Sequence, residues 1–221
     1  MSSPAQLIEG FSRFRERHFA KDDALFRGLV EQGQTPRILV VACCDARVDP
    51  ALILDCAPGD LFVIRNVANL VPPAENQGHY HGTSAALEFG VRKLNVGHII
   101  VLGHAHCGGI HALLEGDMRK EDAFISEWMG IADAARERVN REFADAGSTA
   151  RHRACEQQAI LVSLNNLMTF PWIHERVEQG TLALHGWYFD IERGELLGYN
   201  AAARQFEVLQ GTCNYLPVNS L

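Results

Sequence analysis

The sequence predicts an α/β protein with a mostly parallel central β-sheet flanked by helices and with an N-terminal helical arm. Three observations support this class. Short apolar runs rich in β-branched residues recur at 38–42, 61–64 and 96–103, as expected for strands that are buried on both faces. Segments with helical spacing separate these runs, and that alternation is typical of parallel sheets. Residues 7–30 carry apolar stripes at helical spacing, interleaved with charged residues, which predict the arm.

The arm comes first along the chain. Its two stripes consist of Leu7, Phe11, Phe14 and His18, followed by Leu25, Phe26, Leu29 and Val30. A segment with glycine and proline at 32–36 ends the helical pattern. We therefore expect a helical arm at 1–35 and an α/β domain at 36–221. The stripes would be buried equally well on the chain's own domain or across a partner subunit, and the pattern does not choose between the two.

The elements of the α/β domain follow in alternation. We expect helices at 50–56 and 82–94, after the third strand as far as about 140, at 151–170 and at 171–179. The last of these has a proline in its first turn, where proline is well tolerated. A late strand at 181–191 and its partner at 196–200 are joined by a turn, and a proline-containing loop occupies 72–81.

Composition narrows the class of protein. With 47 % apolar and 21 % charged residues, the 221-residue chain can bury a full core, which excludes a disordered or collagen-like protein. The net charge of −7 argues against nucleic acid as the main partner, because phosphate binding needs a basic face. Six cysteines are too few for a disulfide scaffold and suit a reducing compartment.

The sequence shows no pattern typical of a targeting signal or of a membrane-spanning segment. Residues 1–10 lack the pattern of a secretory signal, and the longest apolar run, at 38–44, is far shorter than a membrane span. We therefore expect a cytoplasmic protein without membrane or nucleic-acid partners.

Reactive side chains follow two of the predicted strands. Cys43 comes at the end of the first strand, and His104 and Cys107 come at the end of the third. Sites in open α/β sheets form beyond the carboxyl ends of the strands, so these side chains are expected to meet. Zinc prefers thiolate and imidazole ligands, and catalytic zinc keeps three protein ligands and one open position.

Each signal alone is weak, because a lone His-x-x-Cys is usually structural and a lone cysteine is usually a small buried hydrophobe. Their joint placement, with Asp45 and Arg47 alongside, favours a zinc site. Gly108 begins the next helix, where its backbone amide is free to face a ligand.

Three motifs resemble those of the β-class carbonic anhydrases of the plant-like subgroup: Cys43-x-Asp45-x-Arg47, Arg65-Asn66-Val67-Ala68-Asn69 and Gly103-His104-x-x-Cys107-Gly108-Gly109. The similarity extends over residues 34–198. It implies a zinc lyase that interconverts carbon dioxide and bicarbonate. It also implies a homodimer or homotetramer in which the arm packs on the partner subunit, so that 1–35 would be a dimerisation arm and 36–221 the zinc-binding catalytic domain.

The resemblance also implies roles for individual residues. One Zn²⁺ per subunit would be held by Cys43, His104 and Cys107. Asp45 and Arg47 would form a gating dyad, in which Asp45 is a conditional fourth ligand. Gln34 would orient the substrate across the dimer interface, and the apolar pocket would contain Phe62, Val67, Tyr80 and Gly108.

Departures from the family pattern qualify these roles. Ala46 stands where the family usually has serine, and we expect little effect on the ligands. An inhibitory bicarbonate pocket of some bacterial members needs a tryptophan, an arginine and a tyrosine. The corresponding residues here are Val40, Arg65 and Phe189, so we expect no bicarbonate inhibition of that type.

The expected function is reversible hydration of carbon dioxide to bicarbonate and a proton, by attack of a zinc-bound hydroxide with help from the Asp-Arg dyad. Two thiolates cancel the charge of zinc, so we expect a less acidic bound water than in a tris-histidine site and activity that rises with mildly alkaline pH. One alternative is a carbon disulfide or carbonyl sulfide hydrolase on the same fold. Another is a non-catalytic zinc or thiol regulatory module, which would not need Asp45, Arg47 and Gln34.

Overall fold

The computed structural model describes residues 3–20, 23–75, 80–117 and 121–209. The chain divides into two compact units, Met1–Thr35 and Pro36–Leu221. In the described residues, no helix has the length and apolar character needed to cross a membrane.

The N-terminal unit is helical, as the apolar stripes predict. It contains α1 (Pro4–Arg15), a π-helical turn at Glu16–Ala20 and α2 (Ala24–Gln32). A capping box, formed by the Ser3 and Gln6 side chains, starts α1. The rings of Phe14, Phe19 and Phe26 pack together where the helices adjoin. None of the described residues in α1 or α2 is buried.

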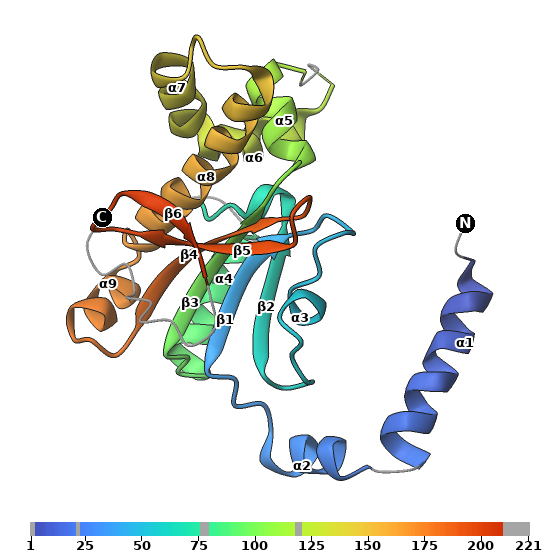
Figure 1. Ribbon diagram of the computed structural model, residues 1–221. Helices are drawn as coiled ribbons and strands as arrows, with labels where there is room; N and C mark the ends of the chain where they lie inside the picture. The colour runs from blue at the N-terminus through green and yellow to red at the C-terminus, as the bar shows by residue number, and fades with distance from the viewer. Residues whose placement is uncertain (1–2, 21–22, 76–79, 118–120, 210–221) are drawn as a thin grey trace. The chain divides into compact units, whose positions relative to one another are not determined.

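The second unit is built on a six-stranded sheet in the order β2-β1-β3-β4-β5-β6 (Figure 1). The strands are β1 (Ile38–Cys43), β2 (Leu61–Asn66), β3 (His98–His104), β4 (Ala183–Asp190), β5 (Glu195–Asn200) and β6 (Gln205–Val208). The first four strands are parallel, and β5 and β6 are antiparallel. The predicted α/β class with a mostly parallel sheet is therefore confirmed.

Helices flank this sheet, as predicted. They are α3 (Pro50–Ile53), α4 (Gly82–Glu88), α5 (Gly108–Glu115), α6 (Ala123–Met129), α7 (Asp133–Glu142), α8 (Ser148–Leu167) and α9 (Pro171–Glu178). Shorter turns lie at Val67–Asn69, Phe89–Lys93 and Gly130–Ala132. Figure 1 shows α5, α6 and α7 grouped at one end of the sheet.

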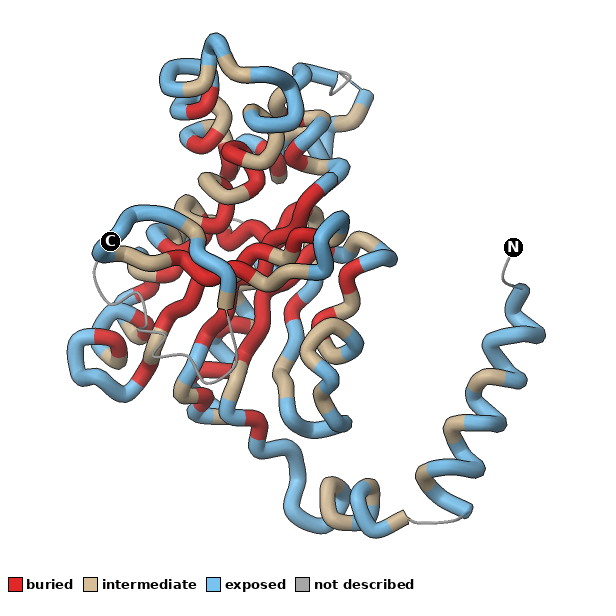
Figure 2. Tube along the Cα trace, viewed as in Figure 1, coloured by how far each residue is buried: buried red, intermediate tan, exposed pale blue. Residues whose placement is uncertain are grey.

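The largest core cluster lies between the sheet and helices α4, α8 and α9. Alternate strand residues, such as Leu39 and Val101, pack with Ile160 and Leu164 of α8 in one buried cluster. Figure 2 shows the buried positions concentrated along the central strands. This alternation puts one set of strand side chains against the covering helices and fixes the strand register.

Beyond shifts of a few residues at the ends of other elements, the structure differs from the sequence-based prediction at the helix after β1, at the start of the third strand and at the far edge of the sheet. The helix predicted at 50–56 ends after Ile53, since Asp55 adopts a left-handed conformation (φ 51°) and turns the chain. The third strand begins at His98 rather than at 96. The edge strand β6 was not predicted, because it is four residues long and largely exposed and so lacks an apolar pattern.

The strand register brings the predicted reactive residues to one edge. Cys43 at the end of β1 pairs with Asn66, while His104 at the end of β3 pairs with Phe189. Because β1 and β3 are adjacent and parallel, both residues lie at the carboxyl edge of the sheet.

Candidate metal centre

Three buried side chains meet at the carboxyl edge of the sheet. The ligand atoms of Cys43, His104 and Cys107 all lie within 4.8 Å of one another. Cys43 and His104 end their strands, and Cys107 is the residue that caps the start of α5. The structure therefore brings together the three residues that the sequence predicts as metal ligands.

The donor set fits zinc. Two thiolates about 2.3 Å from a tetrahedral zinc ion lie roughly 3.8 Å apart, and the two sulfur atoms here are 4.0 Å apart. His104 Nδ1 lies 2.9 Å from the carbonyl oxygen of Ala105. That contact fixes the ring and leaves Nε2 as the coordinating atom. Nε2 is buried and has no hydrogen-bond partner among the described residues, as a metal-binding nitrogen should.

The thiols of Cys43 and Cys107 are close enough for one to donate a hydrogen bond to the other. A hydrogen bond from Cys107 lowers the pKa of Cys43, although burial acts in the opposite direction. The thiolate of Cys43, followed by burial, raises the pKa of Cys107. A bound cation would favour the deprotonated form of both groups, because a metal ligates the thiolate.

Asp45 and Arg47 form a bidentate ion pair beside the cluster. Arg47 Nε donates to Asp45 Oδ1 at 3.0 Å, and Nη2 donates to Oδ2 at 2.7 Å. These bonds lower the pKa of Asp45 well below its usual range, with a further contribution from the Arg47 amide. Nη2 of Arg47 also donates to the His106 carbonyl at 2.9 Å, which joins the two ligand-bearing loops.

Arg65 fixes the backbone that follows Cys43. Its guanidinium donates to the carbonyl oxygens of Cys43 at 3.0 Å and Asp45 at 2.8 Å. It also forms a salt bridge with Asp49 at 2.8 Å, and the Asp49 carboxylate in turn caps α3. The loop that carries Asp45 is thus held by its backbone as well as by its side chain.

The other predicted site residues lie at different places. Val67 packs against the buried apolar cluster that includes Cys43 and Cys107, and the exposed Tyr80 lines a cavity of about 730 Å³ with Val67, Phe124 and Trp128. Gly108 begins α5, with open space where a side chain would stand.

The two remaining predicted site residues are Phe62, on β2, and Gln34, in the N-terminal unit. Phe62 stacks on Phe89 and pairs with Leu39, four residues before Cys43. At the usual rise, that places it roughly 13 Å along the sheet from Cys43, so a single chain does not bring Phe62 to the cluster. Gln34 is exposed and belongs to the N-terminal unit.

Two residues behind the cluster were not predicted from the sequence. Glu156 of α8 is buried and accepts a hydrogen bond from the Cys107 amide, and Tyr188 of β4 donates to the same carboxylate. The available signal was an acidic residue directly after Ala154 and Cys155, on a buried stretch of the helix.

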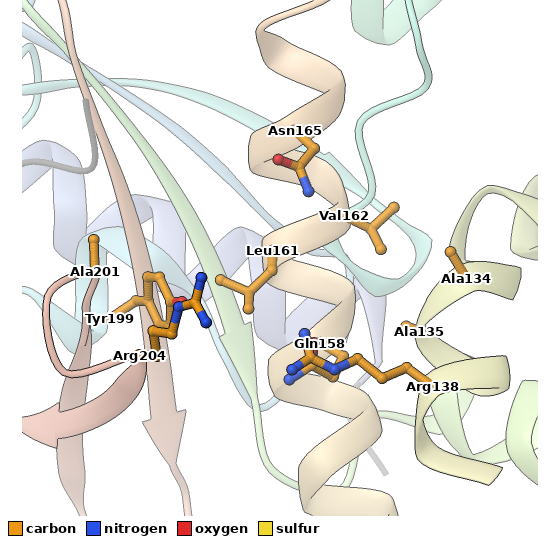
Figure 3. Close-up of a pocket in the computed structure, with 10 residues that line it drawn as sticks. All are labelled: Ala134, Ala135, Arg138, Gln158, Leu161, Val162, Asn165, Tyr199, Ala201 and Arg204. Carbon is orange, nitrogen blue, oxygen red and sulfur yellow. Dashed lines mark hydrogen bonds between the residues drawn. The ribbon is translucent and has the colours of Figure 1, made fainter. Parts of the chain in front are cut away.

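A second cavity, of about 750 Å³, lies between α7, α8 and the turn after β5 (Figure 3). Figure 3 shows Gln158, Leu161 and Asn165 projecting from α8, with Arg138 on one side and Tyr199 and Arg204 on the other. Its lining contains no cysteine, histidine or carboxylate side chain among the described residues. The chemistry of the metal cluster therefore makes that cluster the better candidate for the active centre.

An α/β sheet with two cysteines and one histidine at its carboxyl edge defines the class of metal-dependent α/β enzymes. The family model described as carbonic anhydrase matches residues 38–196 of this chain. The chain is 39 % identical over 214 residues to a carbonic anhydrase of Synechocystis sp., covering 96 % of this chain and 76 % of that protein. The chain therefore belongs to the β-carbonic anhydrase family.

Other relatives agree with this assignment. β-carbonic anhydrase 3 of Arabidopsis thaliana is 37 % identical over 192 residues, covering 86 % of this chain and 74 % of that protein. The solved structure of the β-carbonic anhydrase CcaA superposes with a TM-score of 0.88 at 38 % identity, covering 96 % of this chain and 94 % of that one. A tetrameric β-carbonic anhydrase of Sordaria macrospora gives 0.73 at 30 % identity, covering 89 % and 93 %.

Proposed function

We propose that this enzyme catalyses the zinc-dependent, reversible hydration of carbon dioxide to bicarbonate and a proton. The observation that carries the proposal is the buried cluster of Cys43, His104 and Cys107, whose ligand atoms lie within 4.8 Å of one another. Membership of the β-carbonic anhydrases supplies the reaction, and the cluster supplies residues suited to its metal.

The three clustered residues would hold one zinc ion per subunit. When bound, zinc supplies the Lewis acidity that makes water reactive toward carbon dioxide near neutral pH. Three protein ligands leave one position for water or substrate, as in other catalytic zinc sites. The apolar side chain of Val67 beside the cluster offers a surface suited to a neutral, nonpolar gas.

Asp45 would accept a hydrogen bond from the reacting water. Its ion pair with Arg47 keeps the carboxylate ionised, so that it can act as an acceptor across the working pH range. If that pair opened, Asp45 would be free to become the fourth metal ligand and close the site. The two roles are exclusive at any moment, and Arg47 decides between them.

We also propose that the active form is a homo-oligomer, either a dimer or a tetramer, in the cytoplasm. Apolar side chains exposed on α1 support a partner subunit, as does the tetrameric state named for the Sordaria macrospora enzymes. In such an assembly Gln34 and Phe62 would complete the substrate pocket of a neighbouring subunit, while Tyr80 would line the pocket with Val67 of its own chain. The five cysteines in the described part of the chain are all free, as expected in a reducing compartment.

The test is a stopped-flow assay of carbon dioxide hydration on protein with measured zinc content. We expect one zinc per subunit, loss of activity when a chelator removes it, and recovery when zinc returns. Turnover of carbon disulfide or carbonyl sulfide without carbon dioxide hydration would favour a hydrolase on this fold. Stoichiometric zinc with no turnover of any of these substrates would indicate a structural or regulatory module.

A further inference from the structure

A buried carboxylate stands directly behind one of the metal ligands. Glu156 lies in the first half of α8 and is only 5 % exposed. One of its oxygens accepts a hydrogen bond from the backbone amide of Cys107 at 3.2 Å. The other accepts from the hydroxyl of Tyr188 at 2.6 Å. Both carboxylate oxygens therefore accept hydrogen bonds, one of them from the turn between the predicted ligands His104 and Cys107, which we call the ligand turn.

The surroundings of Glu156 hold it in one position. Tyr188 is fully buried, and the guanidinium of Arg153 lies 5.8 Å from the centre of its ring. Arg153 is paired with Asp190, which is also fully buried and accepts from the amide of Glu192. A buried carboxylate costs several kcal/mol unless it is well paired. Packing alone therefore does not explain why the Glu156 carboxylate lies against the ligand turn.

The ligand turn needs outside support. Between the two ligands, His106 adopts a left-handed backbone conformation (φ 59°), which is unfavourable for a residue with a side chain. The turn is supported from three directions. Arg47 donates to the His106 carbonyl, the Ala105 amide donates to the Phe189 carbonyl, and Glu156 accepts from the Cys107 amide. Of these three, only the Glu156 bond acts on the backbone of a predicted metal ligand.

We infer that Glu156, oriented by Tyr188, is a positioning residue that holds the His104–Cys107 turn in the geometry needed to bind the metal. This inference rests on the proposed zinc site. Its hydrogen bonds link α8 and β4 to the start of α5, so that the Cys107 thiolate is aimed before the metal arrives. Glu156 acts through the Cys107 backbone and does not contact the metal or the substrate.

Three variants separate the hydrogen bonds from the charge. E156Q keeps an acceptor for the Cys107 amide and a partner for the Tyr188 hydroxyl but removes the charge. E156A removes both hydrogen bonds. Y188F keeps the carboxylate but removes the hydroxyl that orients it. The matched control is S163A, which removes two buried side-chain hydrogen bonds on the same helix, one accepted from the Val71 amide and one donated to the Asn69 carbonyl, and neither of them to the ligand turn.

The experiment measures zinc affinity by chelator competition, together with the visible spectrum of the cobalt-substituted proteins. Removing a residue that orients a metal ligand typically weakens binding about 10- to 100-fold. We expect that loss and a shifted cobalt spectrum for E156A, a smaller loss for Y188F, and affinity near that of the unmodified protein for E156Q and S163A.

Each outcome decides the inference. If E156A binds zinc as tightly as the unmodified protein, or if E156Q loses as much affinity as E156A, positioning by Glu156 is refuted. If E156A does not fold, Y188F decides, and unchanged affinity in that variant refutes the inference. If the unmodified protein itself binds no zinc, the proposed function fails instead, so the two failures are distinguishable.

Discussion

Two arginines hold the loop after β1 in different ways. Arg65 donates to the carbonyl oxygens of Cys43 and Asp45, so its contribution is to the backbone. Arg47 donates to the Asp45 carboxylate, so its contribution is to the position and charge of one side chain. Arg47 orients the side chain of Asp45, whereas Arg65 holds the backbone of the ligand Cys43. Loss of Arg47 should therefore lower the reaction rate more than the zinc content.

Replacing Arg47 tests that distinction. We expect R47A to retain about one zinc per subunit yet to lose hydration activity by about 10- to 100-fold, the range seen when residues around a metal site are changed. The freed Asp45 would no longer be kept as an acceptor beside the reacting water. Metal analysis and stopped-flow kinetics on the same preparation give the result.

R92A is the matched control for R47A, since the Arg92 side chain is similarly exposed and forms an ion pair with Glu88, away from the metal cluster. It should leave both zinc content and activity unchanged. Full activity in R47A would remove the Asp-Arg dyad from the mechanism.

Individual ligand residues could be predicted from the sequence because each one follows a buried strand. Parallel strands bring their carboxyl ends to one edge of the sheet, so Cys43 and His104 were expected to lie near one another once the strands were recognised. Glu156 could not be placed in the same way. Its partners lie 49 residues before it and 32 residues after it, and no local pattern relates these positions.

At the scale of elements, the start of α5 fits closely against the turn that contains Val67. A side chain at Gly109 would stand 2.9 Å from Val67 Cγ1 and 3.3 Å from Ala68 Cβ. A side chain at the adjacent Gly108 would meet no atom within 4 Å. Two neighbouring glycines therefore offer opposite packing environments at the same end of one helix.

We expect Gly109→Ala to lower the free energy of unfolding by about 1–3 kcal/mol, as overpacking usually does. Gly108→Ala should leave stability unchanged or raise it by up to about 1 kcal/mol, because alanine favours the helix. Chemical denaturation of the zinc-bound proteins measures both. Equal stability in the two variants would show that α5 does not pack against the Val67 turn as the structure has it.

The pairing of β3 with β4 places two histidines together. His98 Nδ1 and His185 Nε2 are 3.1 Å apart, and burial, with a smaller contribution from His98, lowers the pKa of His185 to about 4. A histidine in the unfolded chain has a pKa of about 6.5. The unfolded chain therefore binds the proton first as the pH falls, and stability decreases from about pH 6.5 toward pH 4.

The variant H185Q should weaken this pH dependence, because glutamine can still bond to His98 but does not titrate. The difference between the two proteins has an upper limit of about 3 kcal/mol at the acid end of that window. Denaturation of zinc-bound H185Q and unmodified protein at pH 7, 6 and 5 measures the slopes, in which the metal contribution cancels. Parallel slopes would contradict the role of His185.

The elements that the sequence predicted well are those with strong apolar periods. The buried strands and the long helix α8 carry enough such residues to be found without any partner. The edge strand β6 and the early end of α3 were missed, because each depends on tertiary hydrogen bonds or on one backbone conformation rather than on a pattern. The same reason hid the π-helical turn at Phe89–Lys93.

At the scale of the whole molecule, the N-terminal unit does not bury its apolar side chains within itself. Leu7, Ile8 and Phe11 of α1 are 69 %, 66 % and 62 % exposed. A run of such residues on one helix indicates an interaction surface. The sequence could show that an apolar stripe exists on the arm but not what it packs on. Packing on the chain's own domain and packing on a partner subunit would bury the same residues. A partner subunit would explain the exposure and would bring the partner's Gln34 to the substrate pocket.

Mixing two inactive variants tests whether Gln34 acts across subunits. In Q34A the metal cluster is intact but the glutamine is missing, whereas H104A lacks a metal ligand but keeps Gln34. If Gln34 completes the neighbouring site, each mixed dimer has one complete site. Unfolding and refolding the two proteins together at equal amounts should then restore about a quarter of the unmodified activity, because half of the dimers are mixed.

The separately refolded variants are the controls and should stay inactive while Q34A alone retains zinc. If Gln34 instead acts within its own chain, every site in the mixture lacks either the glutamine or the metal, and no activity returns. Recovered activity would thus show in one measurement that the enzyme is an oligomer, that the arm reaches the partner, and that Gln34 serves the partner's reaction.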